Sequence, residues 1–129
     1  MNNKEWSIKF STLNNEIDDH HKELFQMTEM IDSTIRNTIC KDNLYTLICF
    51  LEDYTCDHFK EEEALMLEKN FSNIDFHRQE HAYFQARVEP LRAMYERHEY
   101  AHAIFQIRQI IDKLVHHIQT VDIQLRKLK

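Results

Sequence analysis

The chain has 129 residues, no Gly, one Pro, nine His and a formal net charge of −6. Its length fits one domain with a single core. The absence of Gly argues against phosphate-binding loops, Rossmann turns and hairpin-rich β folds, which place Gly in backbone geometries that other residues resist. The acidic charge argues against a nucleic-acid binder, so the composition predicts an all-α protein whose many His need an explanation.

Features that mark export or membrane insertion are absent from the sequence. No apolar run reaches the roughly 18 to 20 residues that span a bilayer, and the N-terminal residues lack the apolar stretch of a signal peptide. Cys40, Cys49 and Cys56 are odd in number and lack CxxC spacing, which fits a reducing compartment. We therefore expect a monomeric cytoplasmic protein that binds no membrane, with the three Cys as small buried helix residues.

Residues 1 to about 14 combine polar side chains with Trp6, Ile8, Phe10 and Leu13, which predicts an extended arm held by its aromatic residues. Asn15 is the expected cap of the first helix. Asp18 would then lie near the positive end of that helix.

Four helices follow from apolar residues repeated at helical spacing. Their expected ranges are about 15–38, 42–69, 73–96 and 99–125. Asn70 is expected to end the second helix in a left-handed conformation, and Pro90 is expected to kink or shorten the third. Long helices with short connections predict an up-down-up-down four-helix bundle.

Polar residues occupy several positions where the helical period calls for apolar ones. They are His21, His58, Glu62, His77, His81 and His117. Burying this many imidazoles without partners would cost on the order of a few kcal/mol each, against a total stability of about 5–15 kcal/mol. A metal bound inside the bundle offsets that cost, because it accepts lone pairs from neutral imidazole and from carboxylate.

The spacing of these residues supports a metal site. His58–Glu62 and His77–His81 are each four residues apart, which places two donors one turn apart on one helix face. Asp122 lies five residues after His117, so the two directions differ by about 140° on an ideal helix, and this is the weakest geometric link.

Five His and two carboxylates exceed the four ligands of one zinc ion and suit two metals bridged by the carboxylates. Dividing five His between two metals leaves an open position on one of them, which suits a small molecule such as dioxygen. The spacing alone accepts iron or manganese.

Four segments in order resemble motifs of the hemerythrins, especially the single-domain bacteriohemerythrins. Residues 16–25 resemble IDxQHxxLF, residues 58–66 resemble HFxxEExxM, residues 77–84 resemble HxxEHxxF and residues 117–122 resemble HIxxxD. The resemblance extends from Trp6 to Asp122 and therefore covers nearly the whole chain.

The resemblance implies a hemerythrin-like bundle with a non-haem di-iron centre (Fe2+/Fe3+, oxo- or hydroxo-bridged) that binds dioxygen reversibly and is not an enzyme. By matched position, His77, His81 and His117 would hold the six-coordinate iron and His21 and His58 the five-coordinate iron, with Glu62 and Asp122 as bridges. Six apolar residues are candidate walls of a dry pocket, and each fits ordinary core equally well. They are Phe25, Phe59, Met66, Phe84, Leu114 and Ile118.

Two pairs of adjacent His leave a choice of one residue at the site. The motif has Gln where this chain has His20, but His21 is in phase with Leu24 and is the expected ligand; His117 is favoured over His116 in the same way. His20, His98, His102 and His116 are assigned no role, and we expect His98 and His102 to face solvent. The alternative functions are a di-iron enzyme that reduces peroxide or nitric oxide, an iron-handling protein, and a structural bundle that holds zinc.

Overall fold

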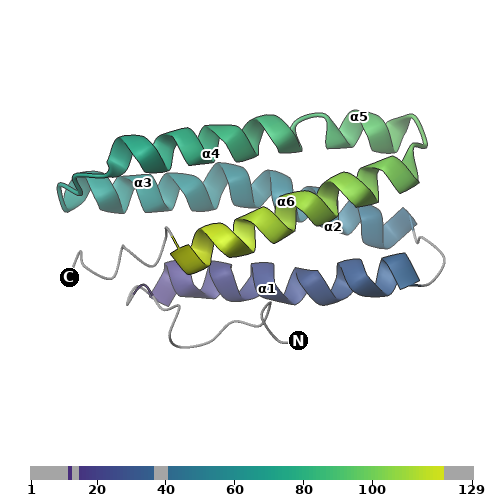
Figure 1. The fold of residues 1–129 in the computed structure, drawn as a ribbon, viewed down its shortest axis with the longest axis horizontal. Coiled ribbons are helices and arrows are strands. Elements are labelled where there is room, and N and C mark those ends of the chain that lie inside the picture. Colours follow the sequence, from purple (N-terminus) through teal and green to yellow (C-terminus); the bar gives the residue numbers. More distant parts are fainter. Residues whose placement is uncertain (1–11, 13–14, 37–40, 121–129) are drawn as a thin grey trace.

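A computed structural model describes residues 12, 15–36 and 41–120 of the chain. These residues form an antiparallel four-helix bundle, which confirms the all-α prediction (Figure 1). The first rod is α1 (Asn15–Arg36), and the second joins α2 (Lys41–Asp53), the π-helical segment η3 (Tyr54–His58) and α3 (Phe59–Glu68). The third joins α4 (Ile74–Val88) and α5 (Leu91–Glu96), and the fourth is α6 (Tyr100–Thr120). None of the described helices is long and apolar enough to span a membrane.

The third rod breaks near the only Pro of the chain. Helix α4 ends at Val88, and Pro90 directly precedes α5, where its fixed φ fits the start of a helix. The sequence analysis expected this interruption, because a Pro inside a helix removes a backbone donor and clashes with the preceding turn.

Apolar side chains fill the bundle on both sides of a polar layer. The larger cluster contains Leu24 and Ile31 of α1 together with residues of α2, α4, α5 and α6. A small cluster of Ile17 and Met66 lies toward the other end, with Phe71 and Ile74 packed against it. Along α1, Ile17 and Leu24 therefore enclose the buried position of His21 between two apolar groups.

The second rod departs from the single α-helix that the sequence predicts. Residues Tyr54–His58 form a π-helical segment, in which the backbone hydrogen bond spans five residues instead of four. Tyr54, Thr55 and His58 are its buried residues, so Cys56 lies on the outer face and is exposed. The expected burial of the cysteines is wrong for Cys56 and only partly met by Cys49, which is half-buried, while Cys40 lies outside the described residues.

The predicted N-terminal arm, including Trp6, Ile8, Phe10 and Leu13, lies outside the described residues. Thr12 is described, and it is buried against the start of α1. Its backbone N–H and its hydroxyl both donate to Oδ1 of Asp18, at 2.8 and 2.9 Å. Asp18 therefore attaches residue 12 to the bundle, a role beyond the helix-end placement that the sequence predicted.

Two helices end in a left-handed residue even though the chain has no Gly. Asn70 has φ 54° and His98 has φ 63°. In each turn the next residue donates its N–H to a carbonyl five positions back, Phe71 to Met66 and Glu99 to Met94, both at 2.9 Å. Both turns are Schellman motifs, in which Gly is the usual residue. The sequence predicted the left-handed conformation for Asn70 but not for His98. His98 is exposed, as expected.

We predict that His98→Gly stabilises the protein, because a non-Gly residue in the left-handed region costs about 1–2 kcal/mol. Gly loses more backbone entropy on folding than His does, and this loss cancels part of the gain. The expected gain in free energy of unfolding is about 0.5–1 kcal/mol, measured by urea denaturation. The control is Gln109→Gly, at an exposed position within α6, which should lose about 0.5–1 kcal/mol. A loss of stability in both variants would contradict the assignment.

Candidate metal centre

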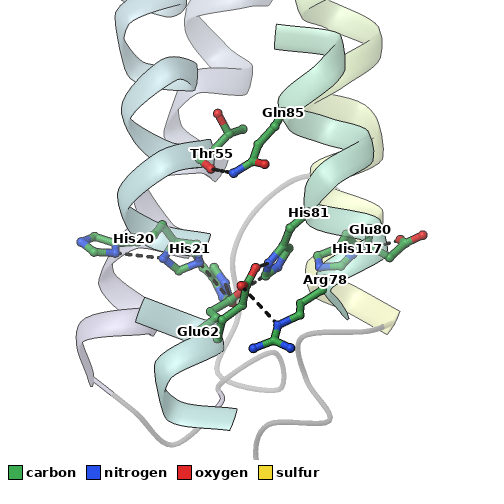
Figure 2. Close-up of polar contacts among 11 residues, drawn as sticks. His20, His21, Thr55, Glu62, Arg78, Glu80, His81, Gln85 and His117 are labelled. Carbon is green, nitrogen blue, oxygen red and sulfur yellow. Dashed lines mark hydrogen bonds and ion pairs between the residues drawn. The ribbon is translucent and has the colours of Figure 1, made fainter. Parts of the chain in front are cut away.

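Six of the seven predicted ligands lie together in the polar layer of the bundle, and Figure 2 shows four of them, His21, Glu62, His81 and His117. Each of the four rods contributes at least one of them, and their exposed fractions lie between 0 and 3%. They are His21 of α1, His58 of η3, Glu62 of α3, His77 and His81 of α4, and His117 of α6. Asp122, the seventh, lies outside the described residues.

The carboxylate of Glu62 lies at the middle of this group. Its Oε2 is 3.1 Å from Nε2 of His21 and 3.1 Å from Nε2 of His58. Its Oε1 is 3.1 Å from Nε2 of His81. Because its two oxygens face donors on different sides, this one carboxylate has the arrangement that a bridge between two metal ions needs.

The surroundings of Glu62 favour its ionised form. Burial would raise the pKa of the carboxyl group, but the charge of His58 and hydrogen bonds with the three facing imidazoles hold this pKa well below its usual value. The group is therefore a carboxylate at neutral pH, which is the form that coordinates a metal.

The donors form two groups with the composition of metal sites. The ligand atoms of His77, His81 and His117 lie within 4.8 Å of one another, and those of His21, His58 and Glu62 do so as well. Neutral imidazole with carboxylate suits first-row transition metals such as iron, and both groups are buried away from water. The residues present therefore fit a pair of such ions.

The outward-facing nitrogens of two ligand candidates contact carboxylates. Nδ1 of His81 is 2.7 Å from Glu63 Oε2, and Nδ1 of His117 is 3.3 Å from Glu80 Oε1. A carboxylate that accepts the Nδ1 proton fixes the ring and leaves the Nε2 lone pair free for a metal. Neither Glu63 nor Glu80 is among the residues that the sequence pattern predicts for the site. Their positions in the sequence could have indicated a role, since each of them is adjacent to a predicted ligand.

The structure distinguishes the adjacent histidines. His21 is fully buried and faces Glu62, whereas His20 is half-buried, with Nδ1 2.9 Å from Nδ1 of His58 (Figure 2). His117 is buried, and His116 is exposed. The sequence left the role of His20 open, and the structure shows that its ring contacts His58 through the nitrogen that points away from Glu62.

Aromatic rings cover the imidazoles on the core side. Phe59 stacks on His81 with ring centroids 3.8 Å apart and planes within 5°, and Phe84 meets His117 edge-on at 5.6 Å. The other four candidate walls are buried as well. They are Phe25, Met66, Leu114 and Ile118. These contacts restrict the rings and exclude water from the layer.

A hydrogen bond between helices supports the π-helical segment that carries His58. The side-chain amide of Gln85 on α4 donates to the backbone carbonyl of Thr55 at 2.7 Å (Figure 2). The Thr55 hydroxyl donates to the Leu51 carbonyl at 2.9 Å. A π-helical turn departs from the regular i→i+4 ladder, and the Gln85 donor adds a hydrogen bond from a neighbouring helix to a carbonyl within it.

Comparisons with known proteins agree with this geometry. The family model of the Hemerythrin HHE cation binding domain matches residues 12–125. The chain is 28% identical over 123 residues to a hemerythrin subunit of Sipunculus nudus, covering 95% of this chain and 91% of that one. It is 30% identical over 121 residues to myohemerythrin-1 of Phascolopsis gouldii, covering 94% and 90%. A hemerythrin-like protein of Naegleria gruberi is 28% identical over 121 residues, covering 94% and 89%.

No solved structure shows a significant match to the chain. The fold and the buried histidine layer define a helical-bundle protein of the metal-binding class. The chain belongs to the hemerythrin family.

We predict that Gln85→Leu weakens metal binding, because the Thr55 carbonyl loses its donor and the π-helical turn that positions His58 loses its support. Affinity should fall about 10- to 100-fold, as when other supporting partners of metal ligands are removed. Equilibrium dialysis at limiting Fe2+ under nitrogen measures this, with far-UV circular dichroism to verify the helices. Gln79→Leu, an exposed position on the same helix, is the control, and equal affinity in the two variants would contradict the prediction.

Proposed function

We propose that the protein binds dioxygen reversibly at a non-haem di-iron centre and acts in oxygen carriage, storage, delivery or sensing. The observation that carries the proposal is the Glu62 carboxylate, buried with one oxygen toward His81 and the other toward His21 and His58. Membership in the hemerythrin family supports the choice of iron.

In this proposal, His77, His81 and His117 hold one iron, and His21 and His58 hold the other. Glu62 and Asp122 would supply the carboxylate ligands that the two irons share. When bound, such a pair supplies two electrons and one open coordination position for dioxygen. The unequal division of the His follows from the two donor groups, since one contains three imidazoles and the other two imidazoles with the carboxylate.

The role of the chain is to orient these ligands and to keep water away from them. Glu63 and Glu80 fix the outer nitrogens of His81 and His117, and Phe59 covers the His81 ring. Excluding water limits protonation and loss of reduced oxygen, which distinguishes reversible binding from oxidation. We therefore propose that the protein binds dioxygen and is not an enzyme. We also propose that it is a monomer.

The test is the visible spectrum of anaerobically reduced protein exposed to oxygen. We expect a charge-transfer band that appears with oxygen and disappears when oxygen is removed under argon. Irreversible conversion to the oxidised form within seconds would contradict reversible binding. Sustained consumption of peroxide or nitric oxide with an electron donor would instead support an enzyme.

Ligand assignments are tested by iron content per chain. We predict that His81→Ala and His117→Ala lose iron, because each removes one of the three imidazoles of a buried donor group. His116→Ala, which changes the exposed neighbour of His117, should retain two irons and the wild-type spectrum. Two irons with an unchanged spectrum in His81→Ala would contradict the assignment.

A further inference from the structure

A pocket of about 210 Å³ opens beside the metal centre, between α1 and the junction of α2 with η3. Glu23, Asp53 and Asp57 line it, and no Lys or Arg among the described residues does. Its most buried lining residues are Tyr54 and His58, which are 4% and 2% exposed. The pocket therefore leads from an acidic surface to a ligand candidate of the centre.

His58 belongs to both the pocket and the centre through different ring nitrogens. Its Nε2 is 3.1 Å from Glu62 Oε2, within the buried layer. Its Nδ1 is 2.9 Å from Nδ1 of His20, a second lining residue of the pocket. The imidazole ring of His58 thus separates the pocket from the buried donor atoms.

A second group of donor atoms lies beside the pocket, and two of its three residues, His20 and His58, line the pocket. Oε1 of Glu61 is 3.2 Å from Nδ1 of His20, and one ligand atom each from His20, His58 and Glu61 lies within 4.8 Å of the other two. Two imidazoles and a carboxylate are donors suited to a divalent transition-metal ion. Binding such an ion here displaces the proton that the two Nδ1 atoms share.

We propose that this pocket opens onto a loading site, in which His20, Glu61 and Nδ1 of His58 bind a divalent transition-metal ion on its way to the buried centre. The inference rests on the proposed function, where the ion is Fe2+. The inner donors are between 0 and 3% exposed, so a hydrated ion must exchange its water for protein ligands before it reaches them. The acidic lining raises the local concentration of cations and thereby speeds their entry.

The first test measures uptake of Co2+ by the metal-free protein in a stopped-flow instrument, using the visible d–d absorption of protein-bound Co2+. The double variant Asp53→Asn/Asp57→Asn removes two exposed charges from the pocket. Uptake should slow about tenfold at low ionic strength, and the difference should shrink at about 0.5 M salt, where charges are screened. Two Co2+ ions per chain should still bind at equilibrium.

The matched control is Glu89→Gln/Glu96→Gln, which makes the same change in net charge at exposed positions outside the pocket lining. Its uptake rate should stay within about twofold of the wild type, because steering depends on where the charges lie. Equal rates in the pocket variant and in this control would overturn the proposal.

The second test is His20→Gln, which keeps a hydrogen-bonding partner for His58 but removes an imidazole from the pocket. Uptake should slow, while the final Co2+ content and the spectrum of the oxygenated iron protein stay as in the wild type. An altered spectrum would show that His20 positions His58, and it would overturn the loading role of His20. An unchanged rate of Co2+ uptake would overturn that role as well. If the wild type itself holds no stable pair of metals, the proposed function fails instead.

Discussion

The buried carboxylate of Glu62 sets the requirements that the rest of the bundle meets. A carboxylate removed from water loses its hydration, and an unpaired charge in a protein interior is strongly destabilising. Here three imidazole nitrogens, from three different helical rods, lie 3.1 Å from its oxygens. These contacts join the second rod to α1 and α4, so polar geometry at this layer adds to apolar packing in setting how these three rods align. Two bound metal cations would add to the stabilisation that the imidazoles give to the negative charge of Glu62.

The layers around the carboxylate act on it in different ways. Stacked and edge-on rings, such as Phe59 on His81, hold the imidazoles from the core side. Glu63 and Glu80 contact the imidazoles from the outside, where both carboxylates are only partly buried. The centre is consequently dry on its inner side and polar on its outer side. The acidic pocket beside His58 lies on the polar side, so a cation approaching there meets donors before it meets apolar surface.

Much of the bundle and the site could be predicted from residue spacing. Polar residues such as His21 and Glu62 interrupt the stripe of apolar residues along a helix, and this stripe shows which side of the helix is buried. The stripe carries no information on what faces a residue from another helix. The contacts of His20 with His58 and of Glu63 with His81 could therefore not be predicted. The π-helical turn could not be predicted for a related reason, since its support comes from Gln85 on another rod.

The π-helical turn also has a consequence for how this protein can change over evolutionary time. The wide turn between Leu51 and Phe59 takes up one residue more than an α-helical turn, which absorbs about 100° of helical phase in the sequence. The half before the turn packs the main core through Leu44, Leu47 and Leu51, and the half after it carries Glu62. A single-codon deletion at this turn would return it to α-helical geometry and leave both faces in place, whereas a deletion elsewhere in the rod would rotate one half against the other by about 100°. The turn is therefore a place where the length of this rod can change while the core-packing half and the Glu62 half keep their orientation.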